Sequence, residues 1–208
     1  IFQERIPRPL LDPEDRPLFS ILGWKTDFRK HSVPYEEIIS GGVPRDGIPP
    51  IYEPKFENIT QASSWLTERD PVVSLELGGE SRAYPLSILI WHEIVNDVVS
   101  GIPVAITYCP LCNTATVFDR HIEGNVFTFG VSGLLRYSDL VMWDHETESL
   151  WQQATGEGIV GVHTGKLLEF FPSSIVSWKD FMAANPEGRV LSRDTGFRRN
   201  YGSNPYKG

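Results

Sequence analysis

The chain has 208 residues, of which 40% are hydrophobic and 22% charged, a composition typical of a globular protein that buries its own core. The formal net charge of −8 argues against binding to nucleic acids or anionic lipid surfaces, because both require clustered positive charge. No segment approaches the ~20 apolar residues that a membrane-spanning helix requires, so we expect no transmembrane segment.

The first part of the chain is rich in proline and charge. A segment such as RIPRPLLDPEDRP forms no long regular element, because each proline fixes φ and removes a backbone donor. We therefore predict an N-terminal arm over residues 1–32 and a single globular domain over residues 33–208.

A hairpin and a helix are the next predicted elements. Residues 72–84 alternate between apolar and polar types on both sides of Gly78-Gly79, a dipeptide that tolerates the positive φ of a tight turn. Good helix formers follow Pro85, and their apolar side chains point to nearly all sides of the helix axis. We therefore expect a buried helix over residues 85–96.

Short strands follow this helix. They are rich in β-branched and aromatic residues with alternating polarity, and they cover residues 103–109, 115–120, 126–129, 140–143 and 149–153. Ser177 and Asp180 resemble a helix cap, which predicts a C-terminal helix over residues 178–184. The predicted fold class is therefore α+β, predominantly antiparallel β, arranged as a barrel or a sandwich.

Both cysteines of the chain lie in one motif between two predicted strands, YCPLCNT at residues 108–114. In thioredoxin-type sites the first cysteine begins a long helix, whose dipole lowers the thiol pKa, but the residues after Cys112 are typical of a strand. A strand, a Cys-Pro-x-Cys turn and a second strand are instead typical of a metal knuckle, which directs both sulfurs at one ion. A redox dithiol and a structural disulfide are the alternatives.

A knuckle built on Cys109 and Cys112 supplies only two ligands, and the chain has no further cysteine. The remaining ligands must be histidine or carboxylate, and a position left to water or substrate favours catalysis over a purely structural role. His92 is the best third ligand, because it lies in the predicted buried helix and a buried imidazole requires a partner. A core histidine bonded to a backbone carbonyl is the alternative. The other histidines lie in polar or turn-like surroundings and are expected to be solvated: His31, His121, His145 and His163.

Five further polar residues are candidates for supporting roles. Glu93 and Asp46 are candidate catalytic acids or bases, and Arg136 is a candidate catalytic anchor for an anionic group of the substrate. Asn96 and Asp144 are candidates for residues that surround the cofactor and orient its ligands. The alternatives are a surface salt bridge for Arg136 and caps on their own backbone for the two aspartates.

Several long blocks of the chain resemble one protein family, the bacterial and archaeal domain of unknown function 3179. The blocks extend from residue 33 to residue 206 and include GGVPRDGIPPIYEPKF, SRAYPLSILIWHEIVND, IPVAITYCPLCNTATVFDR, SGLLRYSDLVMWDHETESLWQQATGEGIVG and VLSRDTGFRRNYGSNPY. The family motifs coincide with His92, Glu93, Asn96, Cys109, Cys112, Arg136, Asp144 and Trp151. Asn113 stands where the family pattern has glycine after the second cysteine.

The resemblance implies an exported protein, in the periplasm, on the cell surface or outside the cell. Members of the family commonly carry an N-terminal signal or lipid-anchor sequence, and a chain that begins at Ile1 fits a mature form. The resemblance implies no particular activity.

The residues favour an exported metalloenzyme with an open site of Cys109, Cys112 and His92. These soft ligands suit copper, iron or zinc better than Mg²⁺ or Ca²⁺. Copper or iron would make the protein an oxidoreductase, which we favour over a zinc-dependent hydrolase or lyase, and its substrate would be a small molecule or a polymer. The alternatives are a metal-free thiol-disulfide oxidoreductase and a binding module with a structural disulfide.

Overall fold

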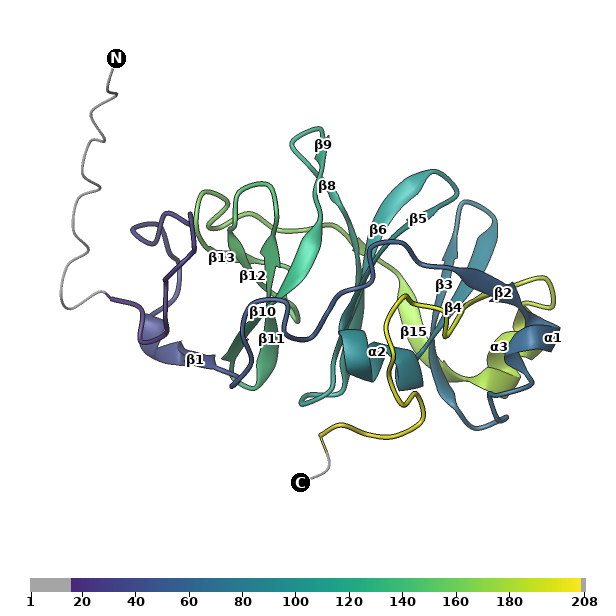
Figure 1. Cartoon of the computed structure of the whole chain (residues 1–208). Coiled ribbons are helices and arrows are strands. Elements are labelled where there is room, and N and C mark those ends of the chain that lie inside the picture. Colours follow the sequence, from purple (N-terminus) through teal and green to yellow (C-terminus); the bar gives the residue numbers. More distant parts are fainter. Residues whose placement is uncertain (1–15, 207–208) are drawn as a thin grey trace, which may run out of the picture.

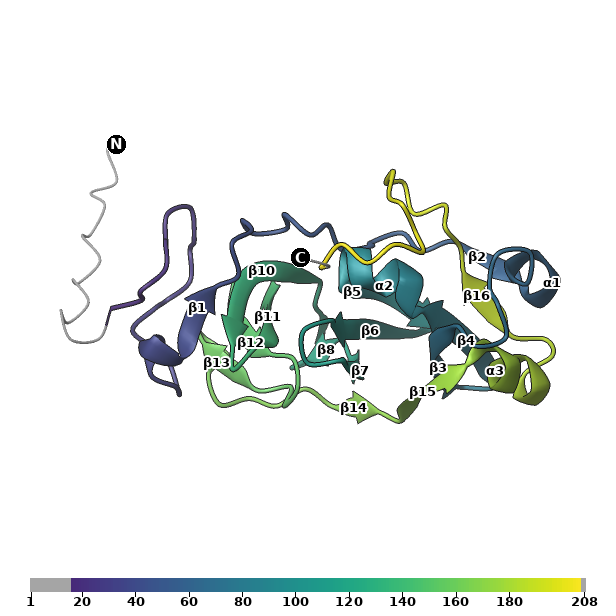
Figure 2. The ribbon, with the colours of Figure 1, turned by 90° about the horizontal axis from the view of Figure 1, so that it is seen from below.

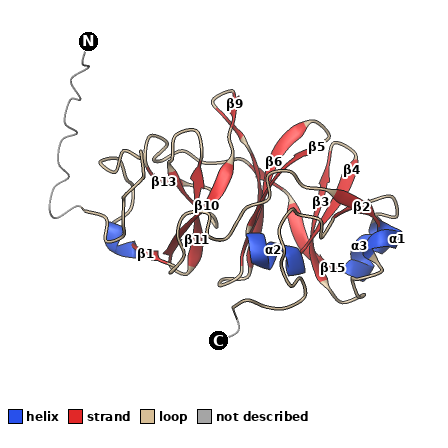
Figure 3. Ribbon diagram, viewed as in Figure 1, coloured by secondary structure: helices blue, strands red, loops and turns tan. Residues whose placement is uncertain are grey.

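The computed structural model describes residues 16–206, so the first half of the predicted arm lies outside the described residues. Strands make up most of the regular structure, and the helices are short (Figure 3). The helical segments are η1 (Tyr35–Glu37), α1 (Ile59–Ala62), α2 (Leu86–His92) and α3 (Trp178–Ala184). None of the helices within residues 16–206 has the length and apolar character needed to cross a bilayer.

Three sheets follow one another along the molecule (Figure 1). The first sheet has the order β1 (Ile38–Ser40), β10 (Phe129–Arg136), β11 (Asp139–Asp144), β12 (Leu150–Gln152) and β13 (Gly158–Val160). The second sheet has the order β14 (Phe170–Phe171), β7 (Thr114–Asp119), β6 (Ile102–Cys109) and β5 (Ile94–Val99). The third sheet has the order β15 (Ser173–Ser177), β3 (Pro71–Leu77), β4 (Glu80–Pro85), β16 (Arg189–Leu191) and β2 (Phe56–Asn58). A small hairpin of β8 (His121–Ile122) and β9 (Asn125–Val126) completes the strands of the described residues.

Antiparallel pairing dominates these sheets. In the described part of the chain, the pair of β4 and β16 is the one parallel pair between named strands. The predicted class, α+β with predominantly antiparallel strands, is therefore confirmed.

The second sheet lies between two hydrophobic cores. Val104 and Ile106 of β6 face a core that includes α2, whereas Ala105 and Cys109 face a core that includes β10 and β11. This division follows from the two-residue period of a strand, which sends successive side chains to opposite faces. It is the reason that β6 reads as a nearly continuous apolar run with buried residues throughout.

Helix α2 is buried as predicted but shorter than predicted. It begins after Pro85 and ends at His92, because Glu93 adopts a φ of 58° that no helix can continue. Residues 94–96, which the pattern assigned to the helix, belong to β5 and pair with β6. Ile94 and Val95 are β-branched and fit the pleated surface of a buried strand.

The predicted hairpin and the predicted C-terminal helix are both present. Strands β3 and β4 are joined by Gly78-Gly79, whose φ angles of 58° and 85° require glycine or a strained residue. Helix α3 spans the predicted residues 178–184, and the hydroxyl of Ser177 accepts the backbone N–H of Asp180 at 3.1 Å.

The described part of the predicted arm packs on the first sheet. Phe19 and Phe28 form an edge-to-face pair that is buried with Tyr35 against this sheet. The Thr26 hydroxyl donates to the carbonyl of Glu148 at 2.6 Å. Residues 19–28 are therefore held by apolar burial and by a buried hydrogen bond.

Candidate metal centre

The two cysteines lie at the turn between β6 and β7. Cys109 and Thr114 form the last pair of the hairpin, which leaves four residues in the turn. Asn113 takes the left-handed conformation with a φ of 52°, and its side-chain oxygen accepts the Tyr108 hydroxyl at 3.0 Å. Asparagine tolerates this conformation better than most residues, so the substitution for glycine preserves the turn.

A third potential metal ligand reaches this turn from the first sheet. The sulfurs of Cys109 and Cys112 and a carboxylate oxygen of Asp139 all lie within 4.8 Å of one another, and within residues 16–206 this is the one group of its kind. The Cys112 sulfur is 3.4 Å from Asp139 Oδ1. Both cysteines are free thiols. The structure therefore brings a carboxylate, rather than the predicted imidazole, to the thiol pair.

Asp139 owes its position to a tight hairpin between β10 and β11. The two turn residues, Tyr137 and Ser138, have φ angles of 54° and 63°, which is typical of a turn that matches the twist of its strands. The second carboxylate oxygen accepts a close hydrogen bond from the Gln152 amide and the backbone N–H of Ala154 at 2.9 Å. These bonds fix Oδ2 and leave Oδ1 directed at the thiols.

Without a bound ion, the surroundings of Cys109 favour the neutral thiol over the thiolate. Burial, together with the neighbouring Cys112 thiol, raises the pKa of Cys109 to about 12. The backbone N–H groups of Cys112 and Leu140 bond to the sulfur and act in the opposite direction, because they stabilise the thiolate. Amides that point at a buried sulfur are the arrangement a metal knuckle needs, since the ion supplies the remaining stabilisation of the thiolate.

His92, the third ligand expected from the sequence, does not belong to this group. Its Nδ1 donates to the carbonyl of Pro49 at 2.7 Å, and its Nε2 accepts the hydroxyl of Tyr201 at 2.7 Å. Burial is the main cause that lowers the pKa of His92, which favours the neutral ring that this pattern requires. The ring is thus a core histidine held by a backbone carbonyl, the alternative considered above.

Glu93 is nearly completely buried. The backbone carbonyl of Glu93 accepts the backbone N–H of Tyr108 at 2.8 Å. Glu93 therefore lies directly next to the residue that precedes Cys109. The Tyr206 hydroxyl donates to Glu93 Oε1 at 2.6 Å, and burial raises the pKa of the Glu93 carboxyl to about 7. Burial and the neighbouring Glu93 carboxyl group raise the pKa of Tyr206. A carboxyl group with this pKa can exchange protons near neutral pH.

Two other predicted residues have structural partners away from the thiols. Arg136 donates through Nε and Nη2 to Glu37 at 2.9 and 2.6 Å, so it forms the salt bridge considered as the alternative to an anion anchor. Asp46 accepts the backbone N–H of Val131 at 2.9 Å and the Trp143 indole at 3.1 Å. Burial raises the pKa of the Asp46 carboxyl.

The two residues expected around the cofactor also have structural partners. The Asn96 side chain bonds to both the N–H and the carbonyl of Phe129, at 2.9 and 2.8 Å. Asp144 accepts the Thr147 backbone N–H at 2.6 Å and the Trp151 indole at 2.8 Å. Both residues connect neighbouring segments of the core.

Sequence reasoning missed Asp139 and Tyr206. Asp139 was one of several aspartates in turn-like surroundings, and the only local signal was its place in the motif RYSD directly after a two-residue turn. Tyr206 is distant in sequence from the residue it contacts. Neither signal is specific enough to select these residues before the fold is known.

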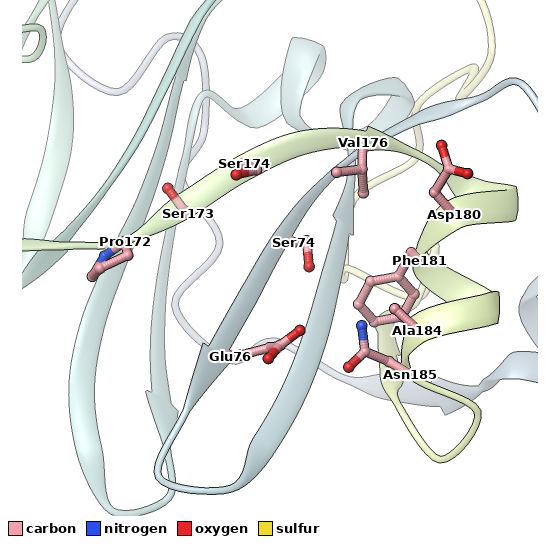
Figure 4. A pocket seen from close by; sticks show the side chains of 10 residues that line it. All are labelled: Ser74, Glu76, Pro172, Ser173, Ser174, Val176, Asp180, Phe181, Ala184 and Asn185. Carbon is pink, nitrogen blue, oxygen red and sulfur yellow. The ribbon is translucent and has the colours of Figure 1, made fainter.

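A separate hollow lies on the third sheet, between β3, β15 and α3 (Figure 4). It has a volume of about 510 Å³, and polar side chains such as Ser74, Glu76 and Asn185 line it. None of the thiol, imidazole or carboxylate groups predicted from the sequence borders this hollow. It therefore adds nothing to the metal centre.

The fold and the site define a β-rich protein with a candidate metal centre of two thiols and one carboxylate. The chain belongs to the family described as protein of unknown function (DUF3179), whose model matches residues 45–208. This confirms the resemblance noted in the sequence. No curated protein and no solved structure matches the chain.

Proposed function

We propose that this protein binds a transition metal ion through Cys109, Cys112 and Asp139. The observation that supports the proposal is the convergence of the three ligand atoms within 4.8 Å at the meeting point of two hairpins. Both cysteines are free thiols, so neither sulfur is blocked by a disulfide. Cys112 is exposed, so an ion can reach the site from solvent.

The ligand set favours zinc or ferrous iron. Zinc accepts cysteine sulfur and carboxylate oxygen in one tetrahedral site, whereas Cu(I) selects soft sulfur ligands. With Asp139 in place of the predicted imidazole, the preference for copper and for redox chemistry becomes weaker. Zinc would instead supply a Lewis acid and an activated water molecule, which is the chemistry of hydrolases and lyases.

Three protein ligands leave one tetrahedral position for water or substrate, which supports a catalytic role. Glu93 is the best candidate for proton transfer, because its pKa of about 7 lies near the working pH of most enzymes. Tyr206 holds the carboxyl group in place through its hydroxyl. An exported location is also part of the proposal, supported by the family resemblance, and cell fractionation with an antibody against the protein tests it.

Elemental analysis of the purified protein, together with Zn²⁺ and Fe²⁺ titrations, tests the metal centre. We expect one ion for each chain, loss of the ion in Cys112→Ser and Asp139→Asn, and retention in His92→Gln, which keeps a polar side chain between Pro49 and Tyr201. Near-ultraviolet circular dichroism shows that each variant is folded. A folded wild-type protein that binds neither ion contradicts the proposal. Loss of metal in His92→Gln with retention in Asp139→Asn would restore the ligand set predicted from the sequence.

A metal-free dithiol enzyme is the second candidate, but the structure gives it less support. In such enzymes an exposed first cysteine with a lowered pKa attacks the substrate. Here the first cysteine is buried and its pKa is raised to about 12. Reaction with a thiol reagent is the direct test, and rapid modification of Cys109 in the folded protein would favour this candidate.

A further inference from the structure

A cavity lies between α2, the loop of residues 43–49 and the C-terminal segment 199–206. Its volume is about 260 Å³. The C-terminal segment runs over α2 in Figure 2, drawn in yellow, and closes one side of this region. Apolar side chains form much of the wall, among them Ile48, Pro49, Ile90 and Trp91. A cavity of this composition suits a small ligand with an apolar body.

Hydrogen bonds hold the C-terminal segment in this position. The Trp91 indole donates to the carbonyl of Ser203 at 3.2 Å, next to the bond between His92 and Tyr201. Tyr206 lines the cavity, and its hydroxyl bonds to Glu93. The cavity wall is therefore preformed, so a ligand does not have to order this segment when it binds.

Arg199 gives the cavity a positive charge. No acidic side chain in residues 16–206 forms an ion pair with Arg199, whose guanidinium lies 6.0 Å from the Trp91 ring and 3.4 Å from the Arg198 carbonyl. Its charge also reaches the neighbouring imidazole, where it adds to the effect of burial in lowering the pKa of His92. An arginine without an acidic partner at the edge of an apolar cavity is suited to bind an anionic group through two hydrogen bonds.

We propose that this cavity binds a small organic carboxylate, with its carboxylate on Arg199 and its apolar part against Trp91 and Pro49. The volume of about 260 Å³ is below the roughly 300–1,000 Å³ of sites for drug-sized ligands, so the acid is small. The role of this acid as a substrate of the metal centre rests on the proposed function. The binding of the acid to the cavity does not.

Binding of small carboxylates to the purified protein tests the proposal. The probes are acetate, butyrate and benzoate, with benzamide as the uncharged analogue of benzoate and phenyl phosphate as a second anion, measured by thermal shift and by calorimetry. We expect at least one of the carboxylates to bind and benzamide to bind at least about tenfold more weakly, since a charge-assisted pair is lost. Arg199→Ala should weaken carboxylate binding by about tenfold or more.

Arg198→Ala is the matched control, because Arg198 is an adjacent exposed arginine that does not line this cavity. It should bind the carboxylate as the wild type does. The proposal is overturned if none of the three carboxylates binds, if only phenyl phosphate binds, or if Arg199→Ala and Arg198→Ala behave alike. Repeating the measurement with Cys112→Ser separates the two proposals, because carboxylate binding should persist there while the metal is lost.

Discussion

Glu93 combines an unusual backbone with an unusual environment. Its φ of 58° is uncommon for a residue with a side chain, and the residue is only 6% exposed. Because burial raises its pKa from 4.5 to about 7, the folded protein favours the protonated carboxyl group. Strained and desolvated residues of this kind concentrate at functional sites.

This pKa predicts a specific dependence of stability on pH. The contribution of the protonated carboxyl group to the free energy of unfolding is fully present below pH 4.5 and is lost as the pH rises through 7. The free energy of unfolding falls by about 3 kcal/mol over this range. Glu93→Gln, which mimics the protonated form, should be the more stable protein at pH 8 and should lack this part of the pH dependence. Urea unfolding at pH 5 and pH 8 measures the difference. Exposed Glu53→Gln is the control and should follow the wild type.

His163 differs from the expectation that it is solvated. It is 7% exposed, and within the described residues neither ring nitrogen has a hydrogen-bond partner. The ring packs against Phe127 and Trp151, with centroids 5.2 and 5.6 Å away. A buried polar group without a partner costs about 1–3 kcal/mol.

We therefore predict that His163→Phe stabilises the protein, because phenylalanine fills a similar volume without an unpaired nitrogen. The free energy of unfolding should rise by about 1 kcal/mol or more, which calorimetry would detect as an increase in Tm of about 2–4 °C. His121→Phe is the control, since His121 is exposed and bonds to Asp119. A lower Tm for His163→Phe would indicate that the imidazole nitrogens are satisfied in solution.

At the scale of the element, a bulge in β10 determines how this strand meets its neighbours. The register of β10 against β11 shifts between Val131 and Leu134, where Gly133 has a φ of 78°. A Cβ atom on Gly133 would lie 2.2 Å from the carbonyl oxygen of Val43. Only glycine therefore allows the loop at Val43 to approach the strand that leads to Asp139.

Gly133→Ala should destabilise the protein by about 3 kcal/mol or more, because backbone strain and a clash with backbone act together. Gly124→Ala is the matched control: its φ is 82°, and a Cβ there would meet nothing within 4 Å. It should cost only about 1–2 kcal/mol, the price of the left-handed conformation. Chemical denaturation of both variants measures the difference, and equal losses would show that the close approach to Val43 is unimportant.

At the scale of the whole molecule, the side chain of Asn96 helps to connect two sheets. Asn96 of β5 bonds to both backbone groups of Phe129, the first residue of β10. These bonds link the second sheet, which carries the thiols, to the first sheet, which carries Asp139. Asn96 therefore supports the site through the relative position of the sheets.

Asn96→Ala should lower the free energy of unfolding by about 2–5 kcal/mol, because it leaves the N–H and the carbonyl of Phe129 buried without partners. Asn125→Ala, which removes an exposed side chain of the β8–β9 hairpin, should change it by less than about 0.5 kcal/mol. Urea denaturation compares the two variants. A small effect at Asn96 would show that water replaces its two bonds.

The sequence by itself determined much of the local structure. Alternating polarity predicted the hairpin at Gly78-Gly79 and the strands on both sides of the cysteines, and Ser177 predicted the start of α3. These elements follow local rules, since side chains alternate along a strand and a hydroxyl caps the first turn of a helix. The context of strand, turn and strand also favoured a knuckle over a thioredoxin-type site.

Tertiary structure decided where α2 ends and which residue joins the thiols. The helical pattern continues past His92, but pairing of Ile94–Asn96 with β6 outweighs helix propensity. His92 and Asp139 were both available as a third ligand, and no local pattern distinguishes them. The β10–β11 turn carries Asp139 to Cys112, whereas Tyr201 and Pro49 engage both nitrogens of His92. A ligand set depends on contacts between residues distant in sequence, and only the packing of the sheets specifies those contacts.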